Sequence, residues 1–321
     1  MTRPLRRLLL AAPAIALLVA ALGVAGCGGH GSGAATTQPP APSVTSRANL
    51  SGTIPRVTPA DFRGPTAVYR RHVRTTLRAM LGDVGRLRAA VAAGDLGAAR
   101  RAWLAADGRY ETIGAAYGAF GALDAAVNGR AAGLPGGTRS KHFTGLHRVE
   151  LALWGRASTR DAARPAAQLA RDVARLRTHV GRIQIDPLEY SLRAHEVLED
   201  TLHLQLTGQA SPWSGDALTA LRANVRGTRV VLDSLRALLA RRNPMVVQRA
   251  DRALAAIDAA LRSVRAPGGA LPRWDRLRRS DRERLAGLTA LAAERLAYVP
   301  GLIDPRPSRA VQRAFGDQET H

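Results

Sequence analysis

The chain is poor in several residue types, and each shortage limits what it can do. It has one cysteine, Cys27, and only two of its three methionines, Met80 and Met245, lie beyond the N-terminal segment. A soft metal site of the Cu(I) type needs thiolate or thioether ligands, so this scarcity excludes one. The metal ligands that remain are imidazole and carboxylate groups, which suit iron, zinc or manganese.

Acidic residues are also few. The chain has 25 Asp and Glu against 47 Lys and Arg, a formal net charge of +22, and Lys141 is its only lysine. Abundant arginine, alanine and glycine are typical of GC-rich coding, so the charge alone does not indicate a ligand. A basic surface still favours anionic neighbours such as lipid head groups or envelope polymers, through a field screened beyond about 8 Å at physiological salt.

The N-terminal segment carries three arginines before an apolar run from Leu8 to about Leu22. This run is too short for a confident membrane span and is typical of an export signal, which argues against nucleic acid as a partner. The segment ends in VAGC, which resembles a bacterial lipobox. We expect residues 1–27 to form a lipoprotein signal peptide with Cys27 as the lipidated residue. The alternative is an ordinary secreted signal with a cysteine nearby by chance.

Composition divides the rest of the chain into three parts. Residues 28–60 are rich in Gly, Pro, Ser and Thr and have almost no large apolar residues, which indicates a disordered tether. Residues 61–300 form the predicted helical domain, and residues 301–321 a C-terminal tail. In the domain, apolar residues recur at steps of three and four, and no useful length alternates at period two. The fold class is therefore predicted to be all-α.

Eight helices are expected, separated by Gly, Pro and Asn-rich breaks. Because most of the connections are short, neighbouring helices should be antiparallel, as in one or two up-down bundles. The expected ranges are 61–93, 95–129, 144–157, 161–182, 187–207, 214–241, 243–265 and 279–298.

A histidine and a glutamate lie three positions apart in the apolar, helix-prone stretch FTGLHRVELALWG. His147 and Glu150 therefore leave one helix face with Cβ atoms roughly 5–6 Å apart, close enough to share a cation. Such a pair also arises often by chance. The alternative is a buried histidine hydrogen-bonded to its own helix neighbour.

Three further carboxylates are candidates. Glu111 and Asp124 lie among apolar residues, where an unpaired charge is costly, so an arginine or a cation must satisfy each of them. In HEVLEDTLH, Glu199 lies one helical turn from His195 and from His203, so the three side chains share one helix face. The alternative is that the carboxylates of this stretch face solvent and pair with arginines. This stretch is not the His-Glu-x-x-His motif of zinc peptidases, because position 199 is glutamate.

Four stretches together resemble a known family: YETIGAAYGAFGALDAAVNGR, FTGLHRVELALWG, HEVLEDTLHLQLTG and LRANVRGTRVVLDSLRALL. They are similar to the imelysin-like domain of the EfeO/EfeM iron-uptake lipoproteins and periplasmic proteins, over about residues 61–300. The most specific part is Gly-x-His-Arg-x-Glu followed by Leu-Trp. The resemblance implies an all-α, imelysin-like fold of two up-down four-helix bundles packed together, without the N-terminal cupredoxin domain of some members.

The resemblance also implies a metal site between helices. His147 and Glu150 occupy the positions of the family's histidine and glutamate, and Glu111, Asp124 and Glu199 match further carboxylates of the family. The choice of iron, Fe(II) or Fe(III), comes from the resemblance, because the residues alone fit Zn(II) or Mn(II) equally.

The chain departs from the family pattern at several positions. Ala122 and Arg226 stand where members often have aspartate, and Ser214-Gly215-Asp216 replaces a Ser-His-Thr-Asp segment. A second metal site built from those groups is therefore not implied. A ferritin-like oxidase would need Glu-x-x-His on two helices, whereas the reversed order occurs once here. We expect capture and delivery of the ion and no enzymatic turnover.

The resulting prediction is a monomeric, lipid-anchored component of an EfeUOB-like iron uptake system on the extracytoplasmic face of the bacterial cell membrane. The resemblance implies an EfeU-like permease and an EfeB-like haem peroxidase as partners. Two alternatives stay open. One is an exported imelysin-like metallopeptidase, with Glu196 or Glu199 recruited as a base, and the other is a basic envelope-binding protein without a metal function.

Overall fold

The computed structural model describes residues 56–305, which are all-α and contain no strand. This confirms the fold class predicted from the hydrophobic period. The signal segment with Cys27, nearly all of the tether and most of the tail lie outside the described residues. Within the described range, no helix combines the length and the apolar character needed to cross a membrane.

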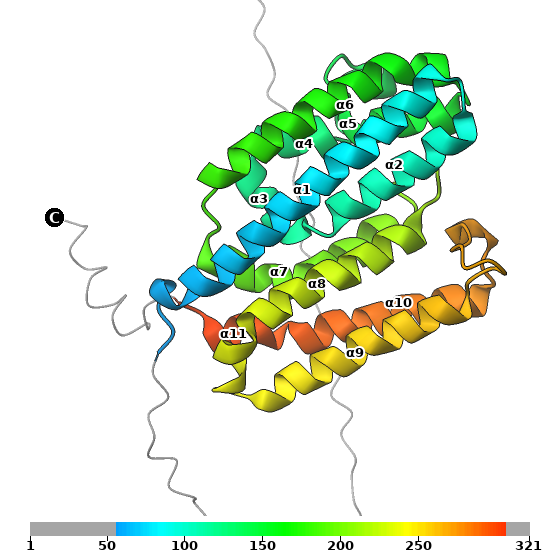
Figure 1. The fold of residues 1–321 in the computed structure, drawn as a ribbon. Coiled ribbons are helices and arrows are strands. Elements are labelled where there is room, and N and C mark those ends of the chain that lie inside the picture. The colour runs from blue at the N-terminus through cyan, green and yellow to red at the C-terminus, as the bar shows by residue number, and fades with distance from the viewer. Residues whose placement is uncertain (1–55, 306–321) are drawn as a thin grey trace, which may run out of the picture. The chain divides into compact units, whose positions relative to one another are not determined.

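The N-terminal helices form one packed group. Helix α1 lies against α2 and α6, and α6 in turn contacts α4 and α5 (Figure 1). The members of this group are α1 (Arg63–Ala92), α2 (Leu96–Glu111), α3 (Tyr117–Phe120), α4 (Ala122–Asn128), α5 (Gly145–Glu150) and α6 (Thr159–His179).

The C-terminal helices form a second group. Helix α9 packs against α8 and α10, and α7 also packs against α8 and α10. Helix α8 additionally contacts α1 and α2, so it joins the two groups, and the buried apolar side chains form one continuous core cluster. The members are α7 (Pro187–Asp200), α8 (Ala217–Ala240), α9 (Pro244–Ser263), α10 (Arg279–Leu296) and α11 (Tyr298–Ile303).

Several helices begin where the sequence carries a capping residue. Asp186 accepts hydrogen bonds from the backbone nitrogens of Leu188 and Glu189, at 2.9 and 3.0 Å, ahead of α7. Asn243 accepts one from Met245 N at 3.1 Å ahead of α9. Both are followed by a proline at the first helical position, where its missing N–H has no partner to lose.

The expectation of one helix over 95–129 is wrong. Helix α2 ends at Glu111, and a 3₁₀ turn at Gly114–Ala116 leads to the short helices α3 and α4. Gly121, between α3 and α4, has φ +56°, which is left-handed backbone that glycine tolerates best. The break allows α4 to fold back, so that Tyr110 OH donates to Asp124 Oδ1 at 2.7 Å.

Two helices end in a π-helical turn. Helix α5 continues as the π turn Leu151–Gly155, and α7 continues as the π turn Thr201–Gln205. Such turns are rare and occur frequently at functional sites. In this chain they follow directly on the helices that carry His147 and Glu199.

Candidate metal site

The position of α5 depends on a glycine at its first residue. Gly145 has φ +77°, and a Cβ there would lie 2.3 Å from the carbonyl oxygen of Val127 at the end of α4. Trp103 Nε1 donates to Leu146 O at 2.9 Å, and Arg100 donates to Leu153 O in the π turn at 2.7 and 3.0 Å. Helix α5 is therefore fixed by α2 and α4 together.

His147 and Glu150 form a direct pair inside the protein. His147 Nδ1 lies 3.1 Å from Glu150 Oε2, and the two residues are 3% and 0% exposed. The other carboxylate oxygen, Oε1, accepts hydrogen bonds from Trp213 N at 3.2 Å and from Ser214 N and Oγ at 2.8 Å. Glu150 is thus held between its own helix and the loop that precedes α8.

Glu111, at the end of α2, is buried near this pair. Its Oε2 accepts a hydrogen bond from Gln205 Nε2 at 3.2 Å. Burial raises the pKa of Glu111, and the Asn224 amide and the charges of His147 and Arg130 partly offset that rise. The carboxylate therefore lies within electrostatic reach of the His147 imidazole.

Two more carboxylates complete the group. Asp107, one helical turn before Glu111 on α2, is 2% exposed. Burial raises its pKa well above the usual range, and the charges of Glu111 and Asp216 raise it further. Burial also raises the pKa of Asp216, the N-cap of α8, to about 6, although hydrogen bonds from Thr219 lower it. We call Asp107, Glu111, Glu150 and Asp216 the buried carboxylate cluster.

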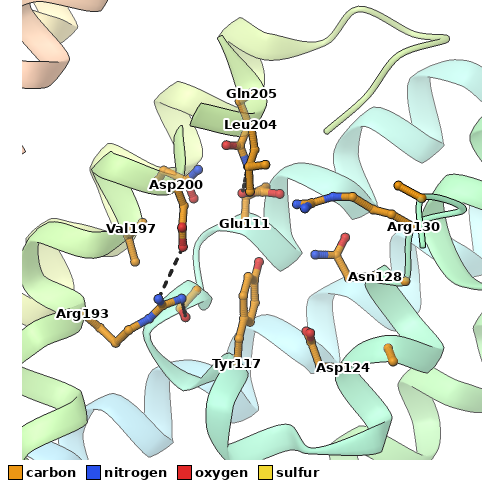
Figure 2. Close-up of a pocket in the computed structure, with 15 residues that line it drawn as sticks. Glu111, Tyr117, Asp124, Asn128, Arg130, Arg193, Val197, Asp200, Leu204 and Gln205 are labelled. Carbon is orange, nitrogen blue, oxygen red and sulfur yellow. Dashed lines mark hydrogen bonds and ion pairs between the residues drawn. The ribbon is translucent and has the colours of Figure 1, made fainter. Parts of the chain in front are cut away.

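Asp124 lies in a pocket beside this cluster. The pocket has a volume of about 450 Å³, and Glu111, Tyr117, Asp124 and Arg130 are among its lining residues. Figure 2 shows Arg130 extending toward Glu111. Burial raises the pKa of Asp124, and the hydrogen bond from Tyr110 and the charge of Arg130 lower it.

The pocket wall contains buried polar atoms without a hydrogen-bond partner. They are Asn128 Oδ1, Arg130 Nε, Arg193 Nε and Gln205 Oε1. Unsatisfied buried donors and acceptors are costly, so native structures keep few of them. Their convergence here, next to a carboxylate cluster, fits a pocket that takes a polar ligand.

The comparisons with known proteins bear on this pocket. The imelysin family model matches residues 65–297, most of the chain. The chain belongs to the imelysin family. This imelysin chain is 25% identical over 243 residues to the iron uptake system component EfeM of Pseudomonas syringae pv. syringae (strain B728a), covering 76% of this chain and 85% of that protein.

Two further relatives carry the name iron uptake system component EfeO. Those of Escherichia coli (strain K12) and Shigella flexneri are both 27% identical over 240 residues, which cover 75% of this chain. The imelysin chain spans 64% of the length of each EfeO protein, just under two thirds. The resemblance to the EfeO/EfeM family predicted from the four stretches is confirmed.

The imelysin domain brings some of the five predicted metal-binding residues together. His147, Glu150 and Glu111 lie in one buried group, and Asp124 lines the adjoining pocket. Glu199 lies apart from these residues, with a side chain that is 47% exposed and an Oε1 atom 3.9 Å from His195 Nε2.

Sequence analysis missed other members of the group. Asp107 could have been found, because it lies one turn before Glu111 and therefore on the same helix face. Asp216 was noticed only as part of a departure from the family pattern. Gln205 and Ser214 gave no local signal, because they reach the cluster through the packing of the second helix group.

The donor set fits a hard or borderline cation, with one imidazole and several carboxylates. As placed, the side chains of residues 56–305 include no set of three or more His, Cys, Asp or Glu close enough to hold a metal ion. Ligation would therefore require the carboxylates to move toward His147. Their raised pKa values indicate that a nearby positive charge would stabilise them.

Proposed function

We propose that this imelysin chain is the metal-binding component of an iron uptake system and captures Fe(II) or Fe(III) at the buried carboxylate cluster. The observation that supports the proposal is a group of three buried carboxylates, Asp107, Glu111 and Glu150, and the partly buried Asp216. His147 lies against Glu150 in this group, and the chain as a whole has a large excess of basic residues. Burying like charges together is unfavourable unless a cation compensates them. The names of the relatives, which are iron uptake components, support iron as that cation.

Within this proposal, His147, Glu150 and Glu111 are the principal ligands. Asp107 and Asp216 add negative charge next to them, and Asp124 lies on the wall of the pocket through which an ion would enter. Glu199, whose side chain is 47% exposed, lies outside the cluster, and this proposal does not make it a ligand. The packing of the helices in two groups also supports our interpretation of the domain as two up-down four-helix bundles.

We further propose that Cys27 carries a lipid that anchors the protein at the extracytoplasmic face of the membrane. Residues 28–60 then act as the tether, and release of the ion occurs to an EfeU-like permease, with an EfeB-like haem peroxidase as second partner. Anchoring donor and acceptor at one surface raises their effective concentration. In this role the chain binds and transfers the ion and performs no hydrolysis, although the family also bears a peptidase label.

Anaerobic titration calorimetry tests the site. The chain from residue 28 onward is titrated with Fe(II), and in parallel with Zn(II) and Mn(II). We expect saturable Fe(II) binding that the double variant His147→Ala/Glu150→Ala loses.

The chain offers a matched control for this experiment. The variant His195→Ala/Glu199→Ala removes the same two residue types, again about one turn apart, from a more exposed position on α7. Binding should persist in this control. If both variants bind as the parent does, the His147–Glu150 pair is structural. If metal-dependent casein cleavage disappears with Glu150→Ala, the peptidase alternative replaces the uptake role.

A further inference from the structure

A second concave site lies on the outer side of the first helix group. It is a groove of about 740 Å³ between the loop that leads into α5 and the N-terminal half of α6. The loop and α5 contribute Arg139, Lys141 and Arg148 to its lining. None of these residues belongs to the buried carboxylate cluster, so the groove is separate from the candidate metal site.

Helix α6 and the turn before it contribute four more cations. Arg160 and Arg164 lie one turn apart and Arg171 two turns further on, which places them along one stripe of the helix. Arg156 is the fourth, and it lies 3.5 Å from Asp161, the only carboxylate of the lining. Seven cationic side chains therefore share a groove with one acidic side chain.

Some arginines elsewhere in the described range form ion pairs with aspartates. Asp83 pairs with both Arg86 and Arg109, and Arg236 pairs with two aspartates. Pairing of this kind is the ordinary state of a charged helix surface. In the groove seven cations share one carboxylate, so an anion bound among them would lower their mutual repulsion.

The shape of the site limits the size of that anion. The cations line a hollow, so they converge on a bound molecule more effectively than on a flat surface such as a bilayer. Arginine binds phosphate and carboxylate groups through two parallel hydrogen bonds, which gives such a site geometric selectivity. We propose that this groove is a binding site for a small polyanion that bears two or more phosphate or carboxylate groups.

Helix α5 contributes Arg148 to the groove and His147 and Glu150 to the candidate metal site. Arg148 in the groove has its guanidinium carbon 5.7 Å from the centre of the Phe143 ring, and Phe143 contacts Trp213 with ring centres 6.2 Å apart. Trp213 N in turn donates to Glu150 Oε1. Three contacts, Arg148 to Phe143, Phe143 to Trp213 and Trp213 to Glu150, therefore link the groove to the carboxylate that faces His147.

Calorimetry with metal-free protein tests the proposal. The chain from residue 28 onward is titrated at physiological ionic strength with two probes, inorganic pyrophosphate and citrate. We expect saturable binding of at least one probe, weakened roughly tenfold or more in Arg160→Gln/Arg164→Gln/Arg171→Gln, because each arginine removed takes charged hydrogen bonds with it.

A matched control removes the same charge from another helix. Arg74, Arg78 and Arg88 are exposed on α1 and do not line the groove. Their triple change to Gln should therefore leave probe binding within about twofold. Equal weakening in both triple variants would mean a general field effect and would overturn the proposal. Circular dichroism and the thermal midpoint verify that both variants are folded.

Two further measurements distinguish binding in the groove from binding at the metal site and from binding to a membrane surface. His147→Ala/Glu150→Ala should bind the probes as the parent does, and loss of binding there would overturn the separate site. Vesicles of phosphatidylglycerol, compared with phosphatidylcholine, test a lipid surface. Vesicle binding that depends on the α6 arginines without any binding of either probe would assign the groove to the membrane, and no binding of either kind would equally overturn the proposal.

Discussion

Asp216 combines two roles that make opposite demands on its charge. As the N-cap of α8 it accepts a hydrogen bond from Thr219 N at 3.4 Å, while its other oxygen, Oδ2, is buried without a partner. The hydrogen bond from Thr219 favours the charged carboxylate, whereas the burial of Oδ2 without a partner favours the neutral acid. The balance leaves the pKa at about 6.

We predict that Asp216→Asn stabilises the metal-free protein in a pH-dependent way. Because the pKa is raised from 3.8 to about 6 on folding, the folded state binds more protons than the unfolded state between these values, and the wild type loses stability as pH rises through them. Asparagine has no such loss and remains a good N-cap. The advantage of the variant should grow from pH 4 to pH 7 by about 2–3 kcal/mol, because a rise of the pKa from 3.8 to about 6 corresponds to about 1.4 kcal/mol for each pH unit.

Urea denaturation across this pH range measures the difference. Asp186→Asn, an N-cap change on α7, is the control for replacing a capping carboxylate by an amide. An Asp216→Asn advantage that is constant with pH would contradict the raised pKa.

Among the individual side chains, the sequence allowed us to predict those whose relation is local. His147 and Glu150 were paired from their spacing, because an i, i+3 separation fixes two side chains on one helix face. The hydrogen bonds from Ser214 and Gln205 could not be predicted in this way. They join residues 64 and 94 positions apart, and only the packing of the two helix groups brings them together.

At the scale of the element, α5 depends on a close backbone contact at its first residue. Gly145 opens the helix where its backbone meets Val127, and the glycine begins the Gly-x-His-Arg-x-Glu pattern. A side chain at this position would have to displace either α4 or α5. Displacement of α5 would move His147 and Glu150 together.

We predict that Gly145→Ala destabilises the protein by at least about 1–3 kcal/mol, the cost of a left-handed conformation at a residue with a side chain, with the backbone clash added. The variant should also weaken Fe(II) binding. Thermal unfolding and the metal titration measure the two effects.

Gly85→Ala is the matched control. Gly85 lies exposed in the interior of α1, and a Cβ there meets nothing within 4 Å. This change should stabilise the protein by about 0.5–1 kcal/mol, since alanine loses less backbone freedom in a helix. A Gly145→Ala variant as stable as the parent would contradict the proposed contact.

Helix boundaries show the same division between local and distant causes. The starts of α7 and α9 were predicted correctly from Asp-Pro and Asn-Pro, which act within one turn. The break after Glu111 was missed because part of its cause lies on α8, where a Cβ at Gly227 would lie 2.6 Å from Thr112 O. The π turn after α5 was also missed, since Arg100 on α2 accounts for one of its carbonyls.

At the scale of the whole molecule, the charge of the chain opposes its proposed cargo. A formal net charge of +22 repels a divalent cation, while the buried carboxylate cluster attracts it at short range. The long-range repulsion extends about 30 Å at 0.01 M ionic strength and about 8 Å at 0.15 M. Added salt therefore removes the repulsion more than it weakens the buried site.

We predict that the association rate of Mn(II) with the protein rises several-fold between about 0.01 and 0.15 M salt, because screening lowers the repulsive barrier. Stopped-flow fluorescence of the tryptophans measures the rate. The same experiment with Mn(II)–citrate provides the comparison, since an anionic complex should associate more slowly as salt is added. A rate for free Mn(II) that falls with salt would show that the cluster dominates the field outside the protein.

Glu150 belongs to the first helix group. Trp213 and Ser214, which donate hydrogen bonds to it, lie just before α8 in the second group, and α8 also contacts α1 and α2. Glu111 meets Gln205 across the same boundary. In the proposed role, an ion bound there would bridge the two helix groups. Ion binding and the packing of the two groups would then be linked, and each would strengthen the other by the same free energy. A partner protein that separates the two helix groups slightly would therefore weaken ion binding without contacting any of the ligands.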